Sequence, residues 1–173
     1  MSNPLHAFPA TCEQTLRALA RYPSRTAFAW PGGSLSYQGA TDLIGRMQSV
    51  FMRLGFAPGT RVAFLTANRA DSWCAGVAAQ LSRLAVTWLH PLGSLDDQLF
   101  QIEDSEAEML IVDGITFRDR GGELALGLAD LVGELRALGD QRLDAAVDVV
   151  DLGAHVRQYR RGHGGHGVSL GRG

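Results

Sequence analysis

The chain contains no lysine; all 16 of its basic residues are arginines. A reaction step that requires a lysine side chain therefore cannot be carried out by this chain alone. Together with 18 acidic residues, the arginines give a formal net charge of -2. Such a charge provides no general attraction to nucleic acids or to acidic membranes, so the sequence predicts no nucleic-acid partner.

Long hydrophobic runs are also missing. The longest apolar stretches, such as residues 75–79, are far shorter than the roughly 20 residues that a membrane-spanning helix needs. Residues 1–21 lack the basic start and the continuous apolar core of a secretory signal peptide. We therefore expect a cytoplasmic protein with no membrane span.

Cysteine is scarce, with only Cys12 and Cys74 present. Two cysteines cannot define a disulfide framework, and no spacing typical of a metal site occurs. Both lie in apolar contexts with helical spacing, which favours small buried thiols in a reducing compartment.

The composition that remains is ordinary for a globular domain, and the patterning indicates a mixed fold. An amphipathic helix is predicted over residues 9–20. Two short strands, at 26–30 and 35–37, flank a Pro-Gly-Gly turn and predict a hairpin. Apolar residues at intervals of three or four from Leu43 to Leu54 then predict the clearest helix of the chain.

Beyond that helix, strands and helices alternate. Apolar runs at 61–66, 85–89 and 109–112 indicate strands, as does a last alternating segment at 145–152. The helices between them are predicted to begin at Asp71 or Ser72, which could cap the first, at Ser94 and near Leu124. This alternation predicts the α/β class, with a largely parallel sheet flanked by helices and a short N-terminal hairpin.

Residues 153–173 differ in character from the rest. From His155 onward the chain has no acidic residue and is rich in glycine, arginine and histidine, so it cannot bury enough apolar surface to fold. We predict one domain over 1–152 and a disordered tail over 153–173. His155, His163 and His166 could be read as metal ligands, but glycines flank the pair at 163 and 166, and we predict no metal site.

Five phrases in a fixed order resemble one known family. They are Arg25-Thr-Ala-Phe followed by Leu35-Ser-Tyr37, the passage 54–65, Asn68 to Trp73, the pair His90-Pro91, and the segment 95–112. In this order they resemble the opening of the AMP-dependent synthetase and ligase family, which includes acyl-CoA synthetases. The likeness covers residues 10 to 114 and extends toward 152, so it implies the N-terminal subdomain of the adenylate-forming enzyme fold.

The resemblance implies a ligase that activates a carboxylic acid, most simply a fatty acid, with ATP and Mg2+ and passes the acyl group to coenzyme A. In the family, a Ser/Thr/Gly-rich loop ending in lysine follows the strand placed here at 145–152. This chain instead reads His155-Val-Arg-Gln-Tyr-Arg-Arg-Gly. The resemblance therefore implies a truncated enzyme, and no catalytic or cofactor-binding residue can be assigned.

His90 is the single substrate-region candidate, because it follows a predicted strand at the end where open α/β sheets bind ligands. The alternative is a histidine that shapes the strand-to-loop turn, and Asn68 has the same two interpretations. Asp96, Asp97 and Glu103 are read as a solvated helix face. Neither glycine pair, at 32–33 or at 121–122, has the spacing of a phosphate loop.

Three functional hypotheses follow. The chain is an inactive fragment of a fatty-acid CoA ligase, or one subunit of a split ligase whose downstream chain carries the remaining motifs, or a non-catalytic interaction domain. In each case we expect an exposed apolar surface, through which the chain could also associate with itself.

Overall fold

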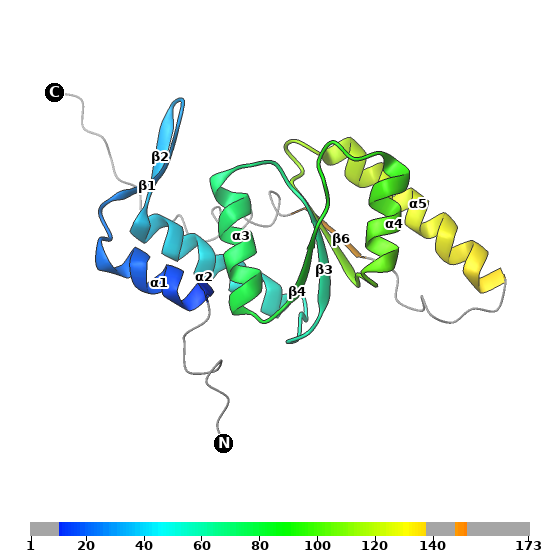
Figure 1. The fold of residues 1–173 in the computed structure, drawn as a ribbon, viewed down its shortest axis with the longest axis horizontal. Helices are drawn as coiled ribbons and strands as arrows, with labels where there is room; N and C mark the ends of the chain where they lie inside the picture. Colours follow the sequence, from blue (N-terminus) through cyan, green and yellow to red (C-terminus); the bar gives the residue numbers. More distant parts are fainter. Residues whose placement is uncertain (1–10, 138–147, 152–173) are drawn as a thin grey trace, which may run out of the picture.

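The computed structural model describes residues 11–137 and 148–151 and shows the predicted α/β fold (Figure 1). The first helix, α1 (Thr11–Arg21), leads into an antiparallel hairpin of β1 (Thr26–Trp30) and β2 (Gly33–Ser36). The turn between these strands contains Gly32 at a φ of 85°, a conformation that glycine adopts without steric cost. The predicted hairpin and first helix are therefore confirmed.

In the described part of the chain, four parallel strands form a central sheet. Its strands are β3 (Arg61–Leu65), β4 (Ala85–Trp88), β5 (Met109–Val112) and β6 (Asp148–Asp151), in the spatial order β4-β3-β5-β6. The helices that accompany them are α2 (Tyr37–Arg53), α3 (Ala70–Leu81), α4 (Leu95–Asp104) and α5 (Arg118–Ala137).

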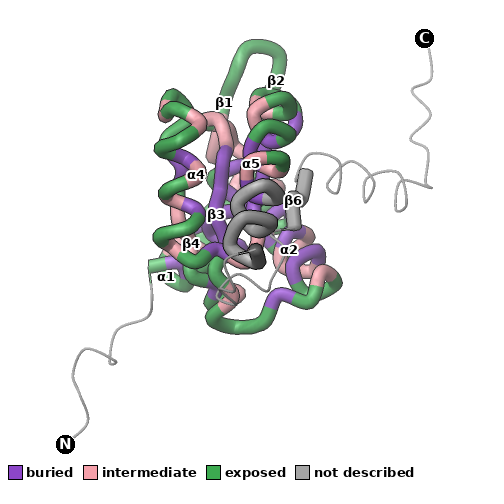
Figure 2. Tube along the Cα trace, turned by 90° about the vertical axis from the view of Figure 1, so that its right-hand side faces the viewer, coloured by how far each residue is buried: buried purple, intermediate pink, exposed green. Residues whose placement is uncertain are grey.

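Helices cover both faces of this sheet, with α1, α2 and α3 on one side and α4 and α5 on the other (Figure 1). Successive side chains of β3 alternate between them: Val62 and Phe64 pack in the first core, whereas Ala63 and Leu65 pack in the second. Figure 2 shows β3 buried between helices whose outer surfaces are exposed. The near-continuous apolar sequence of β3 follows from this double cover.

The helix α2 carries the predicted apolar face. Ile44, Met47 and Phe51 on that face are almost fully buried, and each contributes about 1.5–3 kcal/mol through its removal from water. At the start of the helix, the Ser36 hydroxyl accepts a hydrogen bond from the backbone N–H of Gly39 at 3.1 Å. This bond satisfies one of the free donors at the helix N-terminus.

Both cysteines are buried and unpaired, as predicted. Cys74 lies on α3, which is buried on most of its surface because alanines and glycine allow close approach of its neighbours. Burial raises the pKa of the Cys74 thiol to about 12. This group is therefore a small apolar side chain at neutral pH rather than a nucleophile.

Two predicted helix starts differ from the observed ones. α3 begins at Ala70 with Arg69 at its N-cap, and the predicted caps Asp71 and Ser72 lie inside its first turn, because the Asp71 carboxylate is held by Arg69. α5 begins at Arg118, earlier than the predicted start near Leu124. The third start is confirmed, since Ser94 caps α4 in a capping box with Asp97.

None of the described helices is both long and apolar enough to span a membrane. The predicted disordered tail over 153–173 lies outside the described residues.

Candidate functional site

The strand order places a topological switch point between β3 and β5. After β3 the chain crosses through α3 to β4 on one side, and α4 then returns it to β5 on the other side of β3. Open α/β sheets bind their ligands outside the carboxyl ends of the strands at such a point. The loops that follow Leu65 and Val112 therefore lie at the ligand-binding position of such a fold.

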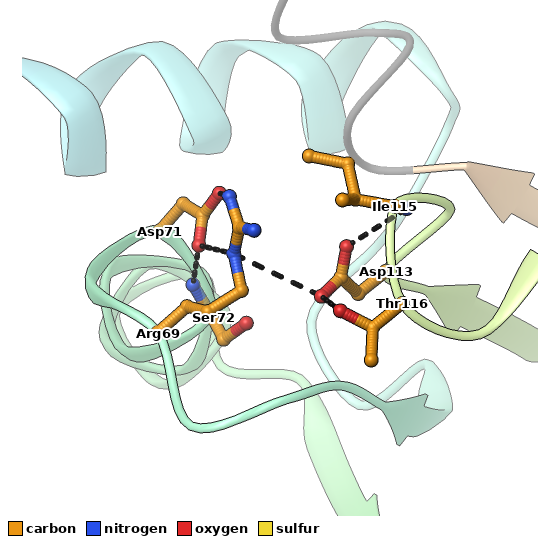
Figure 3. Close-up of polar contacts among 6 residues, drawn as sticks. All are labelled: Arg69, Asp71, Ser72, Asp113, Ile115 and Thr116. Atoms are coloured by element: carbon orange, nitrogen blue, oxygen red, sulfur yellow. Dashed lines mark hydrogen bonds and ion pairs between the residues drawn. The ribbon is translucent and has the colours of Figure 1, made fainter.

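A polar cluster lies at these two loops (Figure 3). Arg69 precedes α3 and donates two hydrogen bonds to Asp71, from Nε to Oδ1 at 3.0 Å and from Nη2 to Oδ2 at 2.8 Å. The Nε of Arg69 also lies 3.8 Å from Oδ2 of Asp113, the residue directly after β5. One guanidinium group therefore faces carboxylates from both loops.

Asp113 is the buried member of this cluster, with a side chain that is 7% exposed. Its Oδ1 accepts a hydrogen bond from the backbone N–H of Ile115 at 3.0 Å, and its Oδ2 accepts one from the Thr116 hydroxyl at 2.9 Å. Its backbone oxygen accepts the N–H of Phe117 at 2.8 Å. These bonds shape the turn that leads from β5 into α5.

The ion pair shifts the pKa values of both partners. Although burial raises the pKa of Asp71, its hydrogen bond and ion pair with Arg69 lower that pKa more strongly, so the net shift is downward. The hydrogen bond to Asp71 raises the pKa of Arg69. Both groups therefore stay charged at neutral pH.

This cluster is suited to hold two loops in place rather than to catalyse a reaction. Its one cation is already paired with two carboxylates, and no group of three His, Cys, Asp or Glu residues in the described part of the chain could bind a metal ion. Sequence reasoning did not identify Arg69 or Asp113 as site residues. Their position in the sequence could have indicated them, since each follows the carboxyl end of a predicted parallel strand by no more than four residues.

His90 lies after a different strand, β4, and is exposed. Its Nδ1 accepts a hydrogen bond from the backbone N–H of Leu92 at 3.2 Å, and its backbone oxygen accepts bonds from Gly93 N–H and the Gln98 side chain. Among the described residues, no hydrogen bond or ion pair joins His90 to the Arg69 cluster. These contacts shape the turn, while a role of His90 in substrate binding stays a prediction.

An open depression of about 550 Å3 lies beside His90. It is bounded by the end of β4 and by one side of α4; its lining residues are Thr87, Trp88, Leu89, His90, Pro91, Gln101, Asp104 and Ser105. The depression thus borders the outer strand of the described sheet and not the switch point.

The remaining residues singled out from the sequence do not gather into one site. Asn68, Asp96 and Glu103 are exposed, and Asp97 is occupied by the capping box. Gly121 and Gly122 lie in the first turns of α5. The histidines at 155, 163 and 166 lie outside the described residues.

Comparison with known proteins gives a consistent picture. The sequence profile of the AMP-binding enzyme family matches residues 16–159. No curated protein sequence matches the chain.

Among solved structures, the fold is similar to O-succinylbenzoate coenzyme A synthetase from Bacillus subtilis, with a TM-score of 0.62 and 19% identity over 83% of this chain and 32% of that one. It is also similar to the N-terminal domain of FACL13 from Mycobacterium tuberculosis, with a TM-score of 0.64 and 21% identity over 86% and 36% of the two chains. A benzoate CoA ligase from Burkholderia xenovorans gives a TM-score of 0.61 and 17% identity over 68% and 24%. The chain thus spans about a third or less of the length of these proteins.

Proposed function

The chain belongs to the AMP-binding enzyme family, and we propose that it forms the N-terminal part of a ligase that joins a carboxylic acid to coenzyme A with consumption of ATP. The family match over residues 16–159 carries this proposal. The fold supports it, because the chain shares its α/β architecture with solved CoA synthetases and ligases.

A fatty acid is the narrower proposal for the substrate. The depression beside His90 is open and does not enclose an acyl chain. Solved structures of similar fold include a benzoate CoA ligase, so aromatic acids are the natural comparison in an assay. Fatty acids of several lengths should therefore be tested beside benzoate.

We further propose that this chain is inactive without additional residues. Neutralising a triphosphate during acyl activation requires cations and aligned donors. The chain has no lysine, and Arg69, the arginine at the switch point, is already paired with Asp71 and Asp113. In the described part of the chain, no three His, Cys, Asp or Glu side chains are grouped as a metal site, so no residue is assigned to hold Mg2+.

The direct test is pyrophosphate release. Purified chain is incubated with ATP, Mg2+, coenzyme A and each acid, and we expect no release above that of a boiled sample. Sustained release that depends on one of the acids would contradict the proposed inactivity and would identify the substrate class at the same time.

A split ligase is the second candidate, and the switch point, where Ile115 is exposed, is the place at which we test it. Ile115 is 55% exposed in the loop that Asp113 holds at the switch point, where a second chain would complete a site. If the ligase is split, the product of the downstream coding sequence should co-purify with this chain. Pyrophosphate release should then appear only when the two chains are mixed.

Two variants make that test specific. Ile115→Asp should weaken the association at least tenfold, whereas Leu126→Asp, on the exposed side of α5, should leave it unchanged. Equal effects of both variants would place the contact elsewhere. Absence of any association would contradict the split ligase. The two remaining hypotheses would then be an inactive fragment and an interaction domain with other partners.

The cytoplasm is the compartment that we propose. Cys12 and Cys74 are both free thiols in the folded chain, as expected for a protein kept in a reducing environment.

A further inference from the structure

We propose that the outer edge of β4 binds an extended, basic segment of a partner protein, which adds to the sheet as a further strand. β4 is the end strand of the described sheet and pairs with β3 alone. Addition of a strand to an exposed sheet edge is a common mode of peptide recognition, in which main-chain bonds provide affinity and side-chain pockets provide specificity.

The backbone of β4 has free groups along that edge. The N–H of Ala85 donates to the Thr60 oxygen at 3.0 Å, and the N–H of Leu89 donates to the Phe64 oxygen at 2.9 Å. In a parallel pair, alternate residues direct both backbone groups to the same neighbour. Val86 and Trp88 therefore direct theirs away from β3, and no described strand receives them.

The edge strand is short, since β4 has four residues, but its sequence contains no other usual protection against pairing. Residues 85–89 read Ala-Val-Thr-Trp-Leu, with no charge and no proline, and the register with β3 has no bulge. Natural sheets protect exposed edges with charges, prolines or bulges, because an open edge is a template for another strand. An edge that has no charge, proline or bulge and is rich in β-forming residues is therefore suited to pairing.

Sites for side chains lie on both faces of the edge. On the α3 side, the ring of Trp88 packs against Phe64 at a centroid distance of 4.8 Å. Trp88 nevertheless remains 49% exposed to solvent. On the α4 side, the depression of about 550 Å3 extends from Thr87 to Gln101 and Asp104. Because side chains of an added strand alternate, they would contact Trp88 and the depression in turn.

The charge of α4 selects the partner. This helix carries Asp96, Asp97, Glu103 and Asp104 and no basic residue. Asp104 lines the depression, and no basic side chain in the described part of the chain forms an ion pair with it. A partner strand with arginine or lysine would satisfy this charge.

A second copy of this chain would not neutralise the acidic charge of α4. If two β4 edges paired antiparallel in one continuous sheet, both acidic α4 helices would lie on the same face and repel each other. The charge distribution thus favours a basic partner strand over self-association through this edge.

The test uses the full chain and a labelled, terminally blocked peptide of alternating valine and arginine, seven residues long. Binding is measured by fluorescence anisotropy, with Glu in place of Arg in a control peptide. We expect saturable binding of the basic peptide, and at least tenfold weaker binding to Val86→Pro, which removes an outward N–H but no bond to β3. Asp104→Asn should weaken binding about fivefold, whereas Asp96→Asn, outside the depression, should change it less than twofold.

Three results would overturn the proposal: equal affinity for the basic and acidic peptides, unchanged binding to Val86→Pro, or a concentration-dependent dimer of the chain that Val86→Pro abolishes. If Val86→Pro fails to fold, as judged by circular dichroism, amide hydrogen exchange on the unmodified chain decides. Slowed exchange at Val86 and Trp88 on addition of the basic peptide supports the proposal, and unchanged exchange at both overturns it.

Discussion

Arg69 and Asp113 join the carboxyl ends of two adjacent parallel strands, with Nε of the arginine 3.8 Å from Oδ2 of the aspartate. The aspartate is the anchored partner, because its side chain is 7% exposed and Arg69 is 38% exposed. This pair connects the loop after β3 to the loop after β5 at the switch point of the sheet.

Replacing Asp113 should destabilise the domain. An asparagine in its place has one acceptor oxygen for the Ile115 N–H and the Thr116 hydroxyl, and it loses the charge that faces Arg69. We expect Asp113→Asn to lower the free energy of unfolding by about 1–3 kcal/mol, measured by urea denaturation. The control Asp42→Asn, at an exposed position bonded to Gln38, should change it by less than about 0.5 kcal/mol; equal losses would contradict the assigned role.

Acid should weaken the loop through Asp71. The pKa of Asp71 is lower in the folded chain than its ordinary value of 3.8, so the folded state binds this proton less readily than the unfolded state. The stabilisation is present above that ordinary value and is lost as the pH falls through the folded pKa. Because Arg69 and Asp71 are both more than a third exposed, the effect should stay below about 1 kcal/mol.

The comparison for this prediction is between pH 7 and pH 3. The urea midpoint of the unmodified chain should fall more between these values than that of Asp71→Asn. An identical pH dependence in the two proteins would show that the ion pair with Arg69 does not stabilise the fold.

Adjacent glycines in α5 should respond in opposite directions to alanine. A Cβ on Gly121 would lie 3.0 Å from Cγ1 of Val112, a buried core residue that would have to shift, whereas a Cβ on Gly122 would meet nothing within 4 Å. Gly122→Ala should stabilise by about 0.5–1 kcal/mol, because alanine loses less backbone entropy in a helix. Gly121→Ala should be destabilising by about 1 kcal/mol, since overpacking exceeds that gain; thermal unfolding of both variants compares them directly.

Replacing Arg83, the second residue after α3, by glycine should stabilise the fold. Arg83 adopts a φ of 58°, a left-handed conformation that is unfavourable for a side chain. Arg83→Gly should therefore raise the free energy of unfolding by about 0.5–1 kcal/mol. Gln80→Gly, an exposed position inside the last turn of the same helix, should lower it by about 1 kcal/mol. A loss in both variants would contradict the assigned strain.

Local patterns in the sequence predicted most of the fold. The spacing of Leu43, Met47 and Phe51 indicated α2, and the apolar run that became β3 indicated a strand covered on both faces. Boundaries were less accurate where a side chain found a distant or competing partner. Asp71 did not cap α3 because Arg69 holds its carboxylate.

The candidate site was less accessible to sequence reasoning. His90 could be placed at a strand end from the sequence, because an apolar run precedes it directly and a proline follows it. Nothing local, however, indicates that Arg69 and Asp113 meet, since the contact depends on which strand lies beside β3.

The sequence by itself determined the family, the α/β class, the burial of Cys12 and Cys74, and the absence of lysine. These properties depend on composition, on periodicity and on phrases of a few residues. Only the tertiary structure decided that the loops after β3 and β5 share an ion pair and that the edge of β4 is open in the described sheet. The physical reason is that parallel strands are joined by crossovers through helices, so their spatial neighbours are set by the packing of the whole sheet and not by adjacency along the chain.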